Sequence, residues 1–362
     1  MSNQVCDSFL SEAATLGVPL ILEVCTVFLL GSLAIPLLRA KKTGRLEWRI
    51  GKRSKTDGSE PSMGGVVAAL AFSVWFFPLA VISDLNGSYN KQDSREGLIF
   101  AGIYVIIIVC AGAAEDRLKK FLGRPAGLPP VIKQLYIYSA SLLLLLAVSL
   151  FGREYTEVLL PFNMGFIEFG VLYYPMVALF MTVCINIFRL HFCLGSDDRD
   201  SVGGLSEVSG ALSLVTVGLC CEECYSYAGS LLAIVAAAAC EGLLIWTLSP
   251  SKLITGESGA MFAGAAFSAA VVLSKLELLF LLAALPQTGD AIVAAVNHLR
   301  FRRHKSRGDN TLPPKLPAHL MLRERGHSDH LIIILFSVLS LIGGAASLLF
   351  AVYAGGYLFM YL

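Results

Sequence analysis

Residues 97–120 read GLIFAGIYVIIIVCAGAAEDRLKK, and this stretch indicates the class of fold. Its first part, residues 97–114, contains no charged side chain, whereas the next residues are Glu, Asp, Arg, Leu, Lys and Lys. An apolar run of about 20 residues matches the hydrocarbon thickness of a bilayer when the run is helical. The stretch therefore predicts a membrane-spanning helix that ends at a polar surface with two adjacent carboxylates.

Similar apolar runs recur along the whole chain. The 362 residues are 56% hydrophobic and only 15% charged, with a mean hydropathy of +0.69, and a soluble core could not bury that much apolar surface. Backbone groups in lipid must hydrogen-bond internally, and no alternating pattern of a barrel is present, so helices are expected. The candidate spans are residues 24–38, 63–83, 97–114, 134–151, 170–188, 205–221, 226–248, 259–274, 278–296 and 331–362.

These runs predict an all-α fold, a polytopic transmembrane bundle of about ten spans. No repeat of clear period, low-complexity tract or soluble segment interrupts them, so residues 1–362 are expected to form a single integral membrane domain.

Basic residues are concentrated in alternate loops. The loop after the first candidate span is strongly basic, whereas residues 84–96 contain only Lys91 and Arg95. The positive-inside rule places the first loop in the cytoplasm, and ten spans then place both termini outside. No Lys or Arg precedes the first span, so a cleaved signal peptide is not expected. The basic residues of the first loop are Arg39, Lys41, Lys42, Arg45, Arg49, Lys52, Arg53 and Lys55.

The charge balance argues against a nucleic-acid-binding protein, and the cysteine spacing argues against a zinc site. The formal net charge is +1, so nucleic acid is not an expected partner, and the basic run at residues 300–307 is attributed to anionic lipid headgroups. Cys220, Cys221 and Cys224 form the densest cysteine group, but no histidine or second pair lies near them in the sequence, as a zinc site would require. They are expected to be small buried residues.

Acidic and basic side chains gather where the predicted spans reach the cytoplasm. Glu115 and Asp116 end one span, and Lys119 follows one turn later. Adjacent carboxylates can bind a hard divalent cation through oxygen, and the ammonium group can neutralise a phosphate. By itself, this stretch also fits solvated charges at an ordinary helix end.

Three further stretches belong to the same predicted face. Asn186 and Arg189 end a span before the acidic loop that contains Asp200, Glu257 stands between two glycines at the start of another span, and residues 317–327 are rich in His and Arg. Free N–H groups at a helix start, together with a carboxylate, suit a metal-bound phosphate. Alone, the stretches also fit a solvated loop, a helix cap and an interfacial amphipathic helix, respectively.

Taken together and in this order, the stretches resemble the motifs of the polyprenyl-phosphate aminosugar-1-phosphate transferases, closest to the bacterial translocase I branch. Residues 61–65, Pro-Ser-Met-Gly-Gly, resemble that family's Pro-Thr-Met-Gly-Gly. Residues 115–119 resemble its Asp-Asp-x-x-Lys, and residues 256–259 resemble its Gly-Asp-x-Gly-Ser. The resemblance runs over nearly the whole chain.

Other matches to this family are partial. Asn186 resembles the first Asn of Asn-Ala-x-Asn, and Asp200 with Gly204 and Leu205 resembles parts of Asp-Gly-x-Asp-Gly-Leu. Residues 317–326 resemble the Pro-Leu-His-His-His stretch. Ten spans with both ends outside is also the architecture that the resemblance implies.

The chain departs from the family pattern on the surface that would carry the chemistry. Glu115 and Glu257 stand where the family has Asp, which keeps the charge and moves each carboxylate about one methylene outward. About eight residues are inserted at 191–199. The remaining departures replace an expected Asn, an expected Asp and two expected histidines: Arg189, Gly203, Leu320 and Met321.

The resemblance implies transfer of phospho-N-acetylmuramoyl-pentapeptide, or a related phospho-aminosugar, from its UDP-activated form to undecaprenyl phosphate, with release of UMP. It implies Mg²⁺ as the cofactor and a multi-pass location in the bacterial inner membrane, with the active site on the cytoplasmic face; a homodimer stays open. The implied catalytic residues are Glu115, Asp116 and Asp200, the metal ligands Asp116 and Glu257, and the substrate-binding residues Lys119, Asn186 and His319.

Two other functions stay open at this point. The departures from the family pattern also fit a catalytically silent paralogue that binds polyprenyl phosphate or a partner. Ionisable residues in or near spans, such as Glu241 and Asp290, also fit a secondary transporter. The two halves of the chain contain no matching pair of segments interrupted by Gly or Pro, which an inverted repeat of a transporter would predict.

The expected topology can be tested at the carboxyl end. A reporter fused after Leu362 should report the outside, because an even number of spans returns the chain to the side on which it began. A cytoplasmic signal from this reporter would show that the number of spans is odd.

Overall fold

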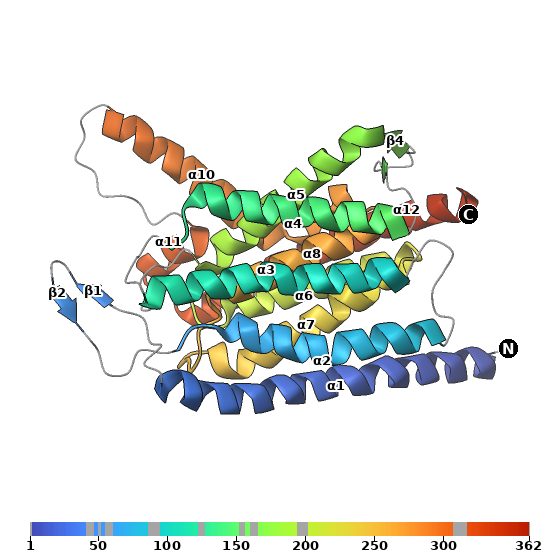
Figure 1. The fold of residues 1–362 in the computed structure, drawn as a ribbon, viewed down its shortest axis with the longest axis horizontal. Helices are drawn as coiled ribbons and strands as arrows, with labels where there is room; N and C mark the ends of the chain where they lie inside the picture. The colour runs from blue at the N-terminus through green and yellow to red at the C-terminus, as the bar shows by residue number, and fades with distance from the viewer. Residues whose placement is uncertain are drawn as a thin grey trace.

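The structure, a computed structural model, describes residues 2–40, 47–49, 52–54, 61–85, 95–121, 127–151, 156–159, 166–193, 202–306 and 317–361. The predicted all-α bundle is confirmed (Figure 1). The longer helices are α1 (Ser2–Ala40), α2 (Gly64–Leu85), α3 (Arg95–Phe121), α4 (Pro130–Phe151), α5 (Tyr173–Cys193), α6 (Leu205–Glu223), α7 (Tyr227–Thr247), α8 (Gly256–Leu273), α10 (Leu285–Ser306) and α12 (Asp329–Tyr361).

Short elements connect these helices. They are the helices η1 (Gly170–Leu172), η2 (Glu277–Leu279), α9 (Phe280–Ala283) and α11 (Ala318–Glu324), and the strands β1 (Glu47–Arg49), β2 (Lys52–Ser54), β3 (Glu157–Leu159) and β4 (Phe166–Glu168). Strand β1 pairs antiparallel with β2, and β3 pairs antiparallel with β4.

Nine helices in the described ranges are long and apolar enough to cross a bilayer, and a bent pair forms a tenth candidate. The sequence predicts residues 278–296 as one continuous span, but the helix breaks at Ala284 and the two parts meet at 83°. Pro286 explains the break, because its ring would clash with the carbonyl of Leu282 in a continuous helix and it has no N–H to donate. Proline is tolerated in the first turn of α10, where it lies.

The outer surface of the bundle is apolar. Leu33, Leu143 and Leu341 are each more than 60% exposed, and many other large apolar side chains face outward beside them. So large an exposed apolar surface is unfavourable in water and favourable against lipid tails. The chain is therefore a multi-pass membrane protein.

Helix α8 lies at the centre of the bundle. It packs against α2, α3, α5, α6 and α7, and every residue from Glu257 to Leu273 is buried. Small residues such as Ala263, Ala266 and Ala270 line this helix and let neighbouring backbones approach closely. The position of α8 therefore fixes the surroundings of Glu257 in its first turn.

The Pro-Ser-Met-Gly-Gly motif holds the segment that leads into α8. Gly64 N donates to Ile254 O at 3.0 Å, Gly65 N donates to Thr255 O at 3.0 Å, and Ile254 N donates to Pro61 O at 2.9 Å. These bonds satisfy two of the four N–H groups that the start of α2 leaves without an intrahelical partner. The motif thus ties the start of α2 to the start of α8.

Glycines allow α2 and α3 to approach the first turn of α8. A Cβ atom on Gly65 would lie 1.9 Å from Gly259 N, and one on Gly112 of α3 would lie 2.7 Å from Ser258 Cα. No side chain fits at either distance, so the convergence of the three helices requires glycine at both positions.

The described parts of the polar stretches predicted to share one face lie at one end of the bundle. Helices α2 and α8 begin near this end, α3 and α5 end near it, and α11 lies beside them (Figure 1). The start of α1 and the end of α12 both lie at the opposite end of the bundle (Figure 1). The side of the membrane that each end faces stays a prediction, and most of the basic loop at residues 39–55 lies outside the described ranges.

Substituting Gly65 tests this close packing. We expect Gly65→Ala to lower the free energy of unfolding by at least about 1–3 kcal/mol, because the added methyl group overlaps the backbone of α8. Thermal unfolding in detergent measures the change. Gly17→Ala in α1 is the matched control, since a Cβ there meets no atom within 4 Å, and it should not destabilise the protein.

Candidate functional site

The first turn of α8 receives its cap from another helix. The side chain of Thr255, at the N-cap position, makes no capping hydrogen bond. Instead, Asp116 at the end of α3 accepts from Glu257 N at 3.0 Å, Ser258 N at 3.1 Å and Ser258 Oγ at 2.9 Å. A carboxylate at a helix start satisfies N–H groups and matches the positive end of the helix dipole. Asp116 therefore links α3 to α8 and stabilises the segment that carries Glu257.

The Glu257 carboxylate contacts two cations from two other helices. Lys119 Nζ lies 2.6 Å from Glu257 Oε1, and Arg189 Nε lies 2.9 Å from Glu257 Oε2. The side chains of Lys119 and Arg189 are 28% and 14% exposed, whereas that of Glu257 is 9% exposed. A carboxylate this buried requires such partners, since an unpaired charge would lose its hydration without compensation.

Glu115 shares the ammonium group of Lys119. Its Oε1 atom lies 3.2 Å from Lys119 Nζ and also pairs with Lys133 Nζ at the start of α4. Its Oε2 atom is buried and has no hydrogen-bond partner in the described ranges. Buried carboxylate oxygens normally have a partner, so Oε2 is free to accept a donor or a cation that enters the site.

Asn186 holds Arg189 in position. Its Oδ1 atom accepts from Arg189 Nη1 at 2.9 Å and from Gln134 Nε2 at 2.9 Å. Its Nδ2 group donates to Gln134 Oε1 at 2.7 Å and to Thr182 O at 2.8 Å. Because both ends of the Asn186 amide are engaged, the residue fixes the guanidinium group beside Glu257.

The polar cluster at the start of α8 therefore joins four helices. Its charged side chains are three carboxylates and three cations, and these charges balance among the described residues. The order of the motifs in the sequence predicts that Glu115, Asp116 and Glu257 converge, and the structure brings them together; their roles stay predictions. The six charged members are Glu115, Asp116, Lys119, Lys133, Arg189 and Glu257.

Sequence reasoning identified part of this cluster. It proposed Asn186 as a substrate-binding residue and treated Arg189 only as a departure, whereas here Asn186 positions Arg189, which pairs with Glu257. Lys133 and Gln134 were not proposed as site residues. A cation and an amide at the start of an otherwise apolar span are the signal that could have indicated them, since such groups in spans are costly without a partner.

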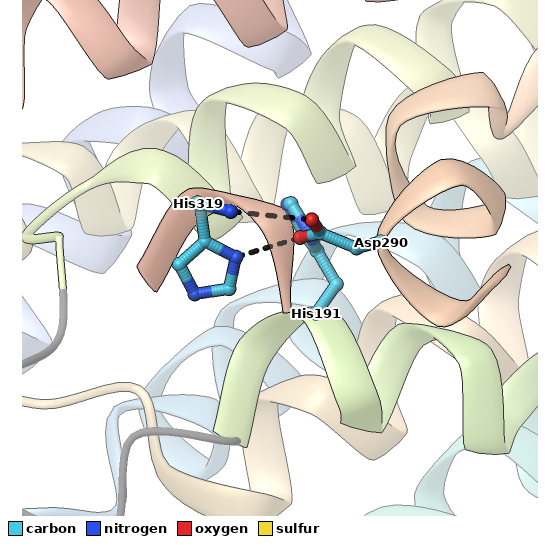
Figure 2. A group of neighbouring side chains, drawn as sticks. All are labelled: His191, Asp290 and His319. Atoms are coloured by element: carbon cyan, nitrogen blue, oxygen red, sulfur yellow. Dashed lines mark hydrogen bonds and ion pairs between the residues drawn. The ribbon is translucent and has the colours of Figure 1, made fainter. Parts of the chain in front are cut away.

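The remaining predicted site residues are Asp200 and His319. Asp200 lies outside the described ranges. His319, predicted as a substrate-binding residue, lies at the start of α11 beside Asp290 of α10 and His191 of α5 (Figure 2), and its role stays a prediction. Gly203, where the family pattern has Asp, is crowded, because a Cβ atom there would lie 2.8 Å from the backbone oxygen of Thr247.

Comparisons with known proteins agree with the motif pattern. The family model described as glycosyl transferase family 4 matches residues 97–275. A phospho-N-acetylmuramoyl-pentapeptide-transferase of Thermoanaerobacter sp. is 29% identical over 283 residues, which cover 75% of this chain and 79% of the relative. The predicted family resemblance is confirmed.

Further relatives with the same name extend the similarity. The protein of Pelotomaculum thermopropionicum is 26% identical over 332 residues, 90% of this chain and 95% of the relative. The protein of Desulfitobacterium hafniense is 25% identical over 270 residues, 72% of this chain and 76% of the relative. The segment matched by glycosyl transferase family 4 contains the whole polar cluster at the start of α8, whereas Asp290 and His319 follow it in the sequence.

A graded series of variants tests the cap on α8. Ser258→Ala removes one hydroxyl hydrogen bond to Asp116 and should lower the free energy of unfolding by about 1 kcal/mol. Asp116→Ala leaves two buried N–H groups without an acceptor and should cost at least about 3 kcal/mol. Unfolding in detergent measures both values. An Asp116→Ala variant as stable as the wild type would show that the cap contributes nothing.

Proposed function

We propose that this protein transfers a phospho-aminosugar, such as phospho-N-acetylmuramoyl-pentapeptide, from its UDP-activated form to undecaprenyl phosphate or a related polyprenyl phosphate. The observation that carries the proposal is the polar cluster at the start of α8, within the segment matched by glycosyl transferase family 4. The relatives are named phospho-N-acetylmuramoyl-pentapeptide-transferases, which supports a phospho-aminosugar as the transferred group. The proposal places the protein in a bacterial inner membrane with this cluster facing the cytoplasm, where UDP-sugars are found.

The reaction exchanges one phosphoanhydride bond for another. An oxygen of the polyprenyl phosphate attacks the sugar-linked phosphorus of the UDP-sugar, and the bond from that phosphorus to the UMP oxygen breaks. UMP leaves with the bonding electron pair, and a lipid-linked pyrophosphate remains. Catalysis of such a transfer depends mainly on holding the two phosphates in line and neutralising charge on their oxygens.

The cations of the cluster suit this task. Lys119 and Arg189 are partly exposed, so each can reach an incoming phosphate oxygen without losing its contact with Glu257. Lys133 is more buried and instead neutralises Glu115. Glu115 would orient the polyprenyl phosphate or accept its proton, although a phosphate monoester with a second pKa of about 6 is largely ionised at neutral pH.

The donor set fits Mg²⁺. Carboxylate oxygens are the ligands that Mg²⁺ prefers, and the open Oε2 atom of Glu115 is available beside Asp116 and Glu257. When bound, Mg²⁺ would neutralise charge on the phosphoryl oxygens. Because the cluster already balances its charges, the anionic substrates would favour entry of the ion, as in sites where Mg²⁺ is held by few carboxylates and by substrate phosphates.

One observation favours a second candidate function, a catalytically silent paralogue. Arg189 replaces the Asn of the family pattern and pairs with Glu257, the proposed metal ligand. A guanidinium group in this place competes with a divalent cation for the same oxygen. Such a protein would bind polyprenyl phosphate without turnover.

Release of UMP tests the proposal. Purified protein with Mg²⁺, undecaprenyl phosphate and a panel of UDP-sugars should release UMP with at least one donor. Glu257→Gln should raise the Mg²⁺ concentration for half-maximal turnover at least about tenfold, because loss of even an outer partner of a metal ligand has an effect of this size. Glu257→Asp should retain turnover, since Asp keeps the charge.

Two comparisons decide between the candidate functions. Glu241→Gln in α7 removes an exposed carboxylate outside the cluster and should leave the Mg²⁺ dependence unchanged. Absence of UMP release by the wild type with every donor, together with release by Arg189→Asn, would identify the silent paralogue. An unchanged Mg²⁺ requirement in Glu257→Gln would contradict the ligand role of this residue.

A further inference from the structure

We propose that His191, Asp290 and His319 form a binding site for a divalent transition-metal ion of the Zn²⁺ type, separate from the proposed Mg²⁺ site. The three residues come from α5, α10 and α11, and one ligand atom from each lies within 4.8 Å of the others. Figure 2 shows the side chains of His319 and His191 beside the Asp290 carboxylate. This inference does not depend on the proposed transferase function.

The two imidazole rings point at one carboxylate oxygen. Nδ1 of His191 and Nδ1 of His319 each lie 2.6 Å from Asp290 Oδ2. The side chains of His191, Asp290 and His319 are 0%, 1% and 6% exposed. Two nitrogens and one oxygen thus converge in a buried place, which is a donor arrangement that a metal site uses.

Neighbouring groups orient the proposed ligands. Asp290 Oδ1 accepts from Ala318 N at 2.9 Å and from His319 N at 3.4 Å, so the other oxygen, Oδ2, is directed at the rings. His191 Nε2 lies 2.7 Å from Ser209 Oγ, and this hydroxyl is itself 2.8 Å from Leu205 O. Outer partners of this kind fix the orientation of metal-binding histidines.

One tautomer of His191 leaves a gap that a cation would fill. In the tautomer with the proton on Nε2, Ser209 Oγ accepts this proton and donates its own to Leu205 O. A neutral His191 ring then presents the lone pair of Nδ1 to Asp290 Oδ2, which also carries lone pairs. In this tautomer two acceptors lie 2.6 Å apart, and a cation between them, either a metal ion or an additional proton, would satisfy both.

The donor set selects the class of metal. Imidazole nitrogen suits Zn²⁺ and related transition ions, whereas Mg²⁺ prefers oxygen ligands. Zinc bonds of about 2.0–2.1 Å place tetrahedral ligand atoms about 3.3 Å apart, so each Nδ1 atom would move less than about 1 Å away from Asp290 Oδ2. The ring of Phe336 in α12 covers the two imidazoles, with its centroid 5.6 Å from that of His191 and 6.2 Å from that of His319. All three proposed ligands are buried, which limits the access of competing water.

A metal ion here would fasten the end of α5 to α10 and α11. His191 follows Arg189 by two residues on α5, and Arg189 contacts Glu257 in the other cluster. The ion would therefore also restrain the stretch of α5 that reaches the polar cluster at the start of α8. Its function is structural, because it ties together three segments far apart in the sequence.

Zinc binding to the purified full-length protein tests the site. After treatment with a chelator, the protein should take up one equivalent of Zn²⁺ per chain in competition with a chromophoric chelator, and excess Mg²⁺ should not displace it. Asp290→Asn and His319→Ala should each weaken Zn²⁺ binding at least about tenfold. His298→Gln replaces an exposed histidine of α10 and is the matched control, with unchanged binding.

A spectroscopic measurement on the wild type tests the site even if the ligand variants do not fold. X-ray absorption at the zinc edge of the wild type should show scattering from two imidazole rings and from oxygen. A shell containing sulfur, or oxygen alone, would overturn the assignment. Folded wild-type protein that takes up no Zn²⁺ would also overturn it, and a proton would then lie between His191 and Asp290. Equal Zn²⁺ affinity of the wild type and both ligand variants would overturn it as well.

Discussion

The start of α8 is the point on which the arrangement of the polar end depends. Its N–H groups lie within the buried part of the bundle, where water cannot satisfy them, and the carboxylate of Asp116 from α3 does so instead. This contact brings together a helix end and a helix start that are far apart in the sequence. Glu115 and Lys119, which share the last turns of α3 with Asp116, are thereby placed beside Glu257.

Glycine makes this contact sterically feasible. Gly65 and Gly112 allow the backbones of α2 and α3 to touch the first turn of α8, and the bonds between residues 61–65 and 254–255 hold the segment before it. The Pro-Ser-Met-Gly-Gly motif therefore contributes to the candidate site without placing a reactive side chain in it. Its effect is to fix the position of the helix that carries Glu257.

Two departures from the family pattern meet in space. Glu257 is longer than the expected Asp, and Arg189 is longer and more basic than the expected Asn, and the two side chains form an ion pair at 2.9 Å. Together with Lys119, Arg189 keeps the buried carboxylate of Glu257 neutralised. Gly203 is a different case, because the backbone of α7 leaves no room for the expected Asp there. The departures are thus accommodated by local packing, and they alter the charge that an incoming substrate meets.

The sequence by itself determined the class of fold and the order of the polar stretches. Uncharged runs such as residues 97–114 match the thickness of a bilayer and recur along the chain, and lipid requires helices, so no tertiary information was needed. The break at Ala284 was missed, because hydropathy does not register the effect of Pro286 on helix direction. The pairing of Arg189 with Glu257 and the meeting of His191, Asp290 and His319 were decided only by the tertiary structure, since each joins helices whose relative positions depend on packing of the whole bundle.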